Sequence, residues 1–203
     1  MLRLGNYEFR YAESEEDFAA VHELNYRTFV REIPQHHDSG NGLLIDKFHQ
    51  KNRYLIAEKQ GRMVGMLSAH DTPPFSIADR LPDASILNQS GVRPVEIRLL
   101  AVEPDERNSP TMAGLVWALY QDAKLHGYTH FVISGVVEQQ ALYLHLGFLP
   151  LGPAVGSGRA QFVPMWLPLP TLEAKMGRLI DLWKKRLNRM ETEPADLVRG
   201  TNR

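Results

Sequence analysis

The chain has 203 residues, of which 43% are hydrophobic, so it is long enough to bury one substantial core. Its 23 basic and 24 acidic side chains leave a formal net charge of −1, which gives no electrostatic reason to expect a nucleic-acid partner. The absence of cysteine excludes disulfides and cysteine nucleophiles, and because no apolar run has the length of a signal peptide or a membrane span, we expect a cytoplasmic protein without a transmembrane segment.

The first half of the sequence predicts a strand, a helix and a hairpin. The segment YEFRYAES reads as a short strand, and Ser14, followed by acidic residues, is a good cap for a helix that continues to about Val30. After a loop broken by proline and glycine, the runs RYLIAEK and RMVGMLSAH are joined by Gln60-Gly61, a spacing typical of an antiparallel hairpin. Residues 71–93 are rich in Pro, Asp and Ser, so we expect a long irregular connection there.

The second half alternates strands with helices. The dense apolar run VEIRLLAV, residues 95–102, is typical of a central strand that is covered on both faces. A helix is expected from about Ser109-Pro110 to Gly127, followed by the strand HFVIS and a shorter helix from Val137 to Leu146. Two extended segments, FLPLG and AQFVPMWLPL, flank the glycine-rich turn GPAVGSGRA. The pattern predicts an α/β (α+β) fold, in which a mixed sheet has helices on both faces.

The last segment has a different pattern. We expect a domain over residues 1–170, an appended amphipathic helix over 171–190 and a flexible tail over 191–203. Three interpretations of this helix stay open: packing on its own domain or on a second subunit, docking of an acidic carrier protein, and binding to a membrane surface. The apolar face of the helix contains Leu172, Met176, Leu179, Ile180, Trp183, Leu187 and Met190.

Two sequence motifs contain candidate functional residues. In the turn VEPDERNSPTMAGL, Arg107 precedes the free backbone N–H groups of a helix start, a combination that can hold a pyrophosphate. The alternative is an ordinary surface arginine in an ordinary turn. In ALYLHLGF, Tyr143 stands four residues before Gly147-Phe148. The adjacent histidines His36 and His37 lack the spacing of zinc sites, so we expect no metal.

The series V-x-P-x-x-R before a helix, with Y-x-x-x-G-F after the next strand, resembles the GNAT acyltransferase superfamily over about residues 6–168. The resemblance implies a mostly antiparallel central sheet, and acetyl-CoA, acyl-CoA or another acyl-phosphopantetheine as co-substrate. It implies that the central strand offers N–H groups to the pantetheine arm and that the next loop wraps the pyrophosphate. The implied residues are Leu100, Ala101 and Val102 for pantetheine, Arg107, Asn108, Ser109, Thr111 and Met112 for phosphate, and Tyr143 as general acid.

A narrower resemblance comes from the order NYRTFVRE, Asp38, Asp46, YLIAEKQGRMVGM and EIRLLAV. This order resembles the GNAT-related N-acyltransferases that include long-chain N-acyl amino acid synthases and, more distantly, acyl-homoserine-lactone synthases. Those enzymes take their acyl chain from acyl carrier protein or CoA. The glutamate of their EISRLAV-like strand matches Glu96, whereas Arg98-Leu99 replace their Ser-Arg pair.

Acyl transfer to an amine needs a base near the acyl carbon and a proton donor for the leaving thiolate. Glu96 is the expected base, directly or through a water, and the alternative is a buried carboxylate paired with a neighbouring arginine. For Tyr143 the alternative is a half-buried aromatic residue on a helix. Glu32, Arg98 and Ser134 are the candidate substrate-binding residues. Ser134 is not a nucleophile of the elbow type, because G-x-S-x-G is absent.

The sequence therefore predicts an N-acyltransferase that moves an acyl group from a CoA or carrier-protein thioester to a small-molecule amine, for example an amino acid, by direct attack. A first alternative is an acetyl-CoA-dependent N-acetyltransferase. A second is a GNAT-like binding or regulatory module without turnover, which is favoured by Pro110 and Met112 where the superfamily's loop usually has glycine. A homodimer is compatible with each of them.

Overall fold

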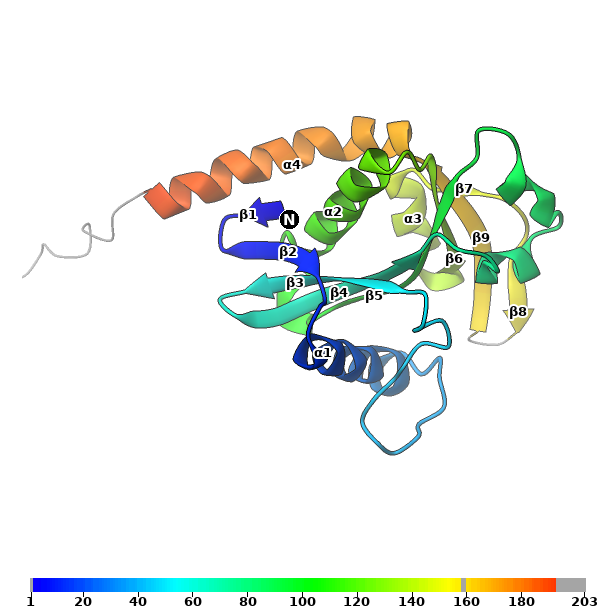
Figure 1. Ribbon diagram of the computed structural model, residues 1–203, viewed down its shortest axis with the longest axis horizontal. Helices are drawn as coiled ribbons and strands as arrows, with labels where there is room; N and C mark the ends of the chain where they lie inside the picture. Colours follow the sequence, from blue (N-terminus) through cyan, green and yellow to red (C-terminus); the bar gives the residue numbers. More distant parts are fainter. Residues whose placement is uncertain (1, 158–159, 193–203) are drawn as a thin grey trace, which may run out of the picture.

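A mixed sheet forms the centre of the protein (Figure 1). The structure is a computed structural model that describes residues 2–157 and 160–192. Its strands are β1 Leu2–Leu4, β2 Tyr7–Tyr11, β3 Arg53–Lys59, β4 Arg62–His70, β5 Pro94–Val102, β6 His130–Val136, β7 Leu149–Pro150, β8 Val155–Ser157 and β9 Ala160–Pro168. Their order is β1-β2-β3-β4-β5-β6-β9-β7, with β8 paired to β9, and only the β5–β6 pair is parallel among the described strands.

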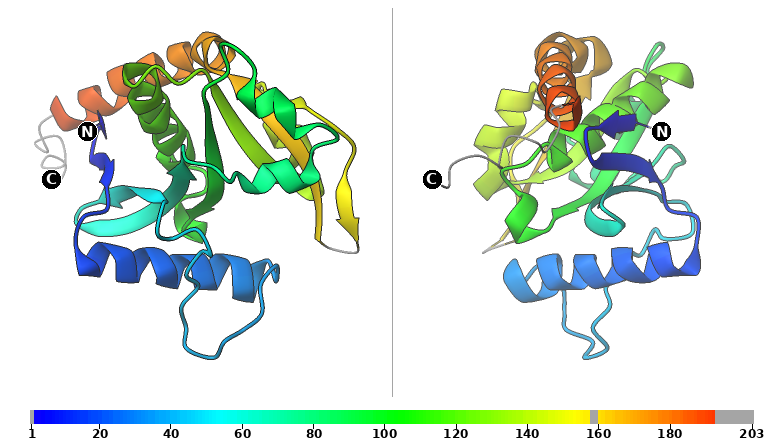
Figure 2. Two further views of the ribbon diagram at one scale, coloured as in Figure 1. Left: turned by 45° about the vertical axis from the view of Figure 1, so that its right-hand side comes forward. Right: turned by 90° about the vertical axis from the view of Figure 1, so that its left-hand side faces the viewer.

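Helices cover both faces of this sheet. One face carries α1, and the opposite face carries α2, α3 and α4 (Figures 1 and 2). The predicted mixed α/β architecture is thus confirmed, as is the mostly antiparallel pairing. The helical segments are α1 Glu15–Tyr26, the π-helical turn η1 Arg27–Glu32, the 3₁₀ turns η2 Ser76–Arg80, η3 Ala84–Asn88, η4 Pro104–Glu106 and η5 Val137–Gln139, and the α-helices α2 Thr111–Leu125, α3 Gln140–Leu146 and α4 Leu169–Thr192.

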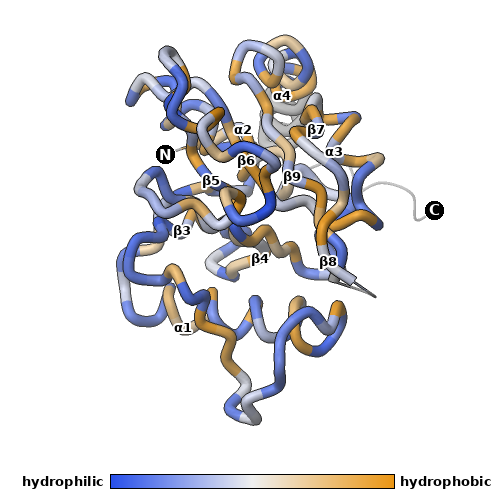
Figure 3. Tube along the Cα trace, turned by 90° about the vertical axis from the view of Figure 1, so that its right-hand side faces the viewer, coloured by the Kyte–Doolittle hydropathy of each residue, from blue (hydrophilic) through white to orange (hydrophobic). Residues whose placement is uncertain are grey.

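The core is divided by the sheet into separate layers. Because side chains alternate along a strand, Leu55 of β3 packs on the α2 side, whereas Tyr54 and Ile56 pack on the α1 side. A third cluster joins Phe75 and Leu87 of the 71–93 connection to β6. Figure 3 shows the hydrophobic residues following β4 and β9 through the interior, while hydrophilic residues are concentrated in the outer loops.

The hairpin between β3 and β4 forms as predicted. Gln60 and Gly61 have φ angles of 52° and 76°, the left-handed pair that a two-residue turn of type I′ requires. The π-helical turn after α1 extends the first helix two residues beyond the expected Val30. The short strands β1 and β8 were not predicted, and β8 lies inside the expected glycine-rich turn. The 71–93 connection contains η2 and η3 rather than only irregular backbone.

The C-terminal helix α4 packs on its own domain. Leu172, Met176 and Ile180 are at most 3% exposed, and α4 contacts α2, β1 and β9. Leu179, which was expected on the same face, is 39% exposed. The side chains of Trp183, Leu187 and Met190 lie outside the described residues, as does the part of the expected tail from residue 193 onward.

Candidate functional site

The parallel strands β5 and β6 are paired over only part of their length. Pro94–Glu96 pair with His130–Val132, but β5 continues to Val102 and β6 to Val136. Beyond the paired part, residues 97–102 of β5 and residues 133–136 of β6 do not pair with each other. We call this region the β5–β6 opening. Such an edge presents backbone N–H and C=O groups that a ligand can pair with.

A β-bulge lies beside the opening. The β4–β5 register shifts between Ser68, which pairs with Leu99, and Ala69, which pairs with Ile97, so Arg98 is the extra residue. A bulge locally re-aims a side chain. The Arg98 guanidinium reaches Asp46, with Nη2–Oδ1 at 3.0 Å and Nε–Oδ2 at 3.2 Å.

This bulge joins two loops that lie far apart in the sequence. Besides pairing with Asp46 of the loop after α1, Arg98 donates a hydrogen bond to Ser76 Oγ at the start of η2. Burial raises the pKa of Asp46, but its bonds with Arg98 and Asn52 prevail and hold that pKa below its ordinary value. The carboxylate is therefore ionised at neutral pH and fixes Arg98 in place.

Glu96 is buried at the last paired position of β5. Its side chain is 1% exposed, and it accepts hydrogen bonds from Ser76 N–H at 2.7 Å, Ser76 Oγ–H at 2.7 Å and Ile77 N–H at 2.8 Å. His70 Nε2 lies 3.0 Å from the same carboxylate. Burial raises the pKa of Glu96, but the nearby His70 ring and the hydrogen bonds from Ser76 outweigh this effect and lower it. The geometry thus joins Glu96 to η2, and the ion pair with a neighbouring arginine that we had considered does not form.

Tyr143 and Ser134 lie near the opposite wall of the opening. The Tyr143 ring packs on Gly135 of β6, where an added Cβ would lie 2.7 Å from two ring carbons, so only glycine permits this approach. Burial raises the pKa of the Tyr143 phenol, although the Val136 N–H lowers it. Tyr143 therefore keeps its proton at neutral pH. The Ser134 hydroxyl oxygen is buried and has no hydrogen-bond partner among the described residues.

The turn between β5 and α2 is fastened to the end of the first helix. Arg107 donates to both oxygens of Glu32, at 2.6 and 2.5 Å, although both side chains are about two-fifths exposed. It also donates from Nε to the Val102 carbonyl at 3.3 Å. Two residues predicted for different ligands, phosphate and acceptor, thus pair with each other. A bidentate carboxylate takes the positions on Arg107 that two phosphate oxygens would take.

The predicted phosphate residues divide into two groups at the start of α2. Arg107 and Asn108 are exposed, whereas Thr111 is fully buried and its N–H is bonded to Ser109 Oγ at 3.2 Å. Ser109 also donates to the Glu106 carbonyl at 2.6 Å. The half-buried Met112 follows. A phosphate would therefore meet Arg107 and the backbone of the first helical turn rather than the Thr111 side chain.

Comparisons with known proteins identify the family and the fold. A family profile for the N-acyl amino acid synthase FeeM matches residues 20–167. The chain belongs to this family. Family and fold identify it as an acyltransferase of the GNAT type. A search of the curated proteins gave no match.

Among solved structures, three neighbours share the fold at low identity. FeeM, an N-acyl amino acid synthase from uncultured soil microbes, is 15% identical, with a TM-score of 0.67 over 84% of this chain and 95% of that one. The acyl-homoserine-lactone synthase LasI is 15% identical, with a TM-score of 0.68 over 85% and 96%. The CoA-dependent acyl-homoserine lactone synthase BjaI, solved with SAM and isopentyl-CoA, is 18% identical, with a TM-score of 0.67 over 86% and 93%.

The described residues contain no group of three or more His, Cys, Asp or Glu side chains arranged to hold a metal ion. None of the helices in residues 2–157 and 160–192 combines the length and the apolar character needed to cross a bilayer.

Several residues around Glu96 and Arg98 were not identified from the sequence. Ser76 lies in a connection without periodicity, so no local pattern marks it. His70 lies directly opposite Glu96 only because of the β-bulge at Arg98, since regular antiparallel pairing would set His70 opposite Ile97. The pairing of Asp46 with Arg98 depends on the same bulge, which the sequence does not reveal.

Proposed function

We propose that this chain transfers an acyl group from the thioester of CoA or of an acyl carrier protein to the amine of a small molecule, with an amino acid as the expected acceptor. The observation that carries the proposal is the β5–β6 opening, which has unpaired backbone on one side and Tyr143 on the other. A pantetheine arm contains two amides, and these can pair with the free edge at Leu100, Ala101 and Val102 in the manner of an added strand.

The proposed reaction is a direct attack. The amine nitrogen attacks the thioester carbonyl carbon, a backbone N–H of β5 stabilises the developing oxyanion, and the C–S bond breaks as the C–N bond forms. Tyr143 gives its proton to the departing thiolate, and its raised pKa keeps that proton in place until it is needed. The attacking ammonium must first lose a proton, which requires a base or a bound water near the acyl carbon. The nitrogen loses a second proton as the amide forms, and this proton returns through solvent to the Tyr143 phenolate.

Glu96 was predicted as this base. Its carboxylate accepts three hydrogen bonds and contacts His70, and a lowered pKa makes it a weaker proton acceptor. These contacts support a positioning role, in which Glu96 fixes η2 and, through Ser76, the bulged Arg98. We keep base catalysis by Glu96 as the alternative that the Glu96 variant described in the Discussion tests.

The donor phosphates are proposed to bind Arg107 after it leaves Glu32. Both side chains are about two-fifths exposed, so exchanging one anion for another costs little desolvation. Once released, Glu32 is a carboxylate on the acceptor side of the chain and could attract an amine. The acceptor class is taken from the family, whose members are described as N-acyl amino acid synthases.

Thermal unfolding with a matched set of donors tests this proposal. We expect stabilisation by long-chain acyl-CoA or acyl carrier protein that exceeds the effect of free CoA, and loss of this gain in Arg107→Ala. Stabilisation by acetyl-CoA alone would instead favour the acetyltransferase. If no thioester stabilises the protein and none yields free thiol with any amino acid, the chain is a binding module and the proposal is wrong.

A further inference from the structure

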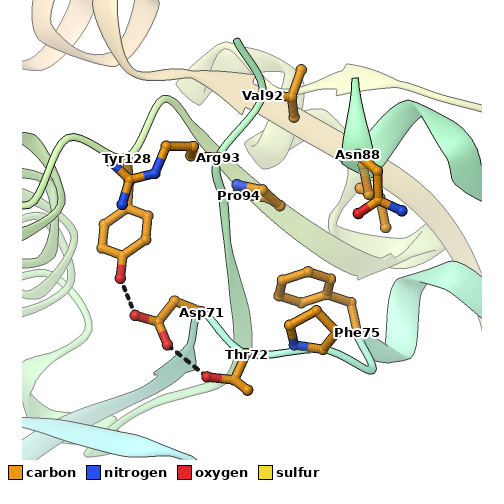
Figure 4. A pocket seen from close by; sticks show the side chains of 10 residues that line it. Asp71, Thr72, Phe75, Asn88, Val92, Arg93, Pro94 and Tyr128 are labelled. Carbon is orange, nitrogen blue, oxygen red and sulfur yellow. Dashed lines mark hydrogen bonds between the residues drawn. The ribbon is translucent and has the colours of Figure 1, made fainter. Parts of the chain in front are cut away.

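A cavity lies at the other end of β5, away from the β5–β6 opening (Figure 4). Its volume is about 460 Å³, within the range of about 300–1,000 Å³ that is common for small-molecule sites. Phe75 and Leu87 form its apolar base and are 7% and 4% exposed. The polar lining residues come from both ends of the 71–93 connection and from the segment after α2: Asp71, Thr72, Asn88, Arg93 and Tyr128.

Asp71 supplies a negative charge to this cavity. Its carboxylate accepts hydrogen bonds from Tyr128 and from Thr72, the latter at 3.0 Å, but it forms no ion pair within the described residues. The bond from Tyr128 and that from Thr72 hold the pKa of Asp71 below its ordinary value although burial raises it. Arg53 also favours the charged form, but it is paired with Asp122 at 2.9 Å. Asp71 thus keeps an uncompensated charge.

Arg93 supplies a positive charge on the other side of the Tyr128 ring. Its guanidinium lies 5.1 Å from the centre of that ring, and Nη1 donates to the Gly127 carbonyl at 3.1 Å. In the part of the chain that the structure describes, no carboxylate lies within ion-pair distance of Arg93. Figure 4 shows Tyr128 between Arg93 and Asp71, so the two charges are held apart by the ring instead of neutralising each other.

The cavity is separate from the β5–β6 opening. Between them lies the stretch where Pro94–Glu96 pair with His130–Val132, which closes the sheet. Phe75 lines the cavity, but the next residue, Ser76, is 3% exposed and bonded to Glu96. A molecule in this cavity would therefore contact the connection that Glu96 fixes without reaching the unpaired edge of β5.

We propose that this cavity binds a free α-amino acid with a large apolar side chain, as a zwitterion. The ammonium group lies at Asp71, the carboxylate at Arg93, and the side chain on Phe75 and Leu87. Opposite charges held apart by one tyrosine ring match the opposite charges of an amino acid. A simple anion would be repelled by the Asp71 carboxylate, and a simple cation would be repelled by Arg93. Each should therefore bind more weakly than a zwitterion.

The proposal gives the chain an amino-acid site that is distinct from the site of acyl transfer. An occupant would join Asp71, at the start of the connection, to Arg93, at its end. It would thereby restrain η2, whose first residue, Ser76, is hydrogen-bonded to Glu96 and to Arg98. The occupant thus acts as an effector of the connection, and its binding does not depend on any thioester.

Isothermal titration calorimetry with L-phenylalanine, without thioester, tests the proposal. The half-ligands are 2-phenylethylamine and 3-phenylpropanoate. We expect L-phenylalanine to bind at least about tenfold more tightly than either half-ligand, and Asp71→Asn and Arg93→Gln each to weaken it by about tenfold or more. Asp79→Asn is the matched control, because this exposed carboxylate of η2 does not line the cavity.

Three outcomes would overturn the proposal: no binding to the unmodified protein, equal binding of one half-ligand, or unchanged binding in both charge variants. The last result would mean that the amino acid occupies the acceptor site of the acyl-transfer reaction. Because Arg93 is exposed, its variant keeps the test decisive if Asp71→Asn disturbs folding through Tyr128. The titration contains no thioester, so its result is independent of whether the chain transfers acyl groups.

Discussion

The two ends of β5 offer two kinds of ligand site. At the carboxyl end, the strand is unpaired on its β6 side and leads through one turn into α2, so contiguous chain supplies most of the proposed donor site. At the amino end, β5 is paired with β6, and the cavity is built from both ends of the 71–93 connection and from the segment after α2. The first site uses backbone, whereas the second uses side-chain charges.

This difference determines what each site can tolerate. A site made of backbone edges depends on strand geometry, and few single side-chain changes remove it. A site made of separated charges is lost when one charge is removed. Glu96 stands at the boundary, because it is the last paired residue of β5 and the anchor of η2.

The largest effect is expected from removing the one side-chain hydroxyl that the carboxyl-end site needs. Tyr143→Phe should lower kcat by about 10²–10⁴-fold, because the thiolate then leaves without a proton donor. The dissociation constant of the thioester should change little. Stopped assays of thiol release, together with calorimetric titration of the donor, measure the two quantities separately.

Tyr120→Phe is the matched control for this change. The Tyr120 hydroxyl is buried on α2 and has no partner among the described residues, so its loss should leave kcat unaltered. If Tyr143→Phe retains full turnover, Tyr143 is only a packing residue on Gly135, and the carboxyl-end site must rely on backbone and solvent alone.

The next largest effect is expected on stability, from a change at Glu96 between the two sites. One oxygen of Glu96 accepts a hydrogen bond from the Ser76 N–H, and the other accepts one from the Ile77 N–H. In a glutamine at this position, the NH₂ group would face one of these two donors in either orientation of the amide. Glu96→Gln should therefore lower the free energy of unfolding by about 2–4 kcal/mol. Urea denaturation measures this loss. Glu8→Gln, at a partly exposed strand glutamate paired with the exposed Arg3, should change stability by less than about 0.5 kcal/mol.

The difference in stability between the protein and Glu96→Gln should decrease at acidic pH. The folded state lowers the pKa of Glu96, so its stabilising effect is complete above the ordinary pKa of a glutamate, about 4.3, and is lost as the pH falls through the folded-state value. The stability gap between the protein and Glu96→Gln should shrink over that range. A stability unchanged by Glu96→Gln, with turnover abolished, would assign Glu96 to base catalysis instead.

The sequence predicted best what is encoded locally. The turn at Gln60-Gly61, the strand over residues 95–102 and the position of Tyr143 before Gly147 each depend on residues close together in the chain. These signals sufficed for the fold class. The three-residue strands β1 and β8 were missed because so few residues show no alternation.

Contacts between distant segments could not be predicted. Arg107 and Glu32 are 75 residues apart, and their local patterns predict different ligands for them, phosphate for Arg107 and the acceptor for Glu32. The contact from Ser76 to Glu96, and the whole amino-end cavity, depend on how the irregular connection folds back over the sheet. No periodicity marks those positions, so their chemistry becomes visible only when the chain is folded.

A smaller effect is expected at the Glu32–Arg107 pair. Glu32→Gln removes the carboxylate that competes with phosphate for Arg107, so the donor should bind about two- to fivefold more tightly, as expected for an exposed ion pair worth about 0.2–1 kcal/mol. Titration of acyl-CoA at low salt measures the change. Asp105→Asn breaks another exposed pair of the same turn, that with Arg62, and serves as the control. Weaker donor binding in Glu32→Gln would show that Glu32 positions Arg107 for the phosphate rather than competing with it.

The smallest effect is expected from removing the hydroxyl of Ser134, which we compare with the structural hydroxyl of Ser68. The buried Ser134 oxygen has no partner among the described residues, so Ser134→Ala should leave the free energy of unfolding unchanged or raise it by up to about 1 kcal/mol. Ser68→Ala is its counterpart, because Ser68 Oγ accepts the Leu99 N–H at 3.2 Å beside the bulge, and should lose about 1 kcal/mol. Equal losses in both variants would mean that the Ser134 hydroxyl has a structural partner. If Ser134 instead faces the donor, its alanine variant should keep its stability but gain less from added thioester than the unmodified protein does, because the hydroxyl is then satisfied only by the ligand.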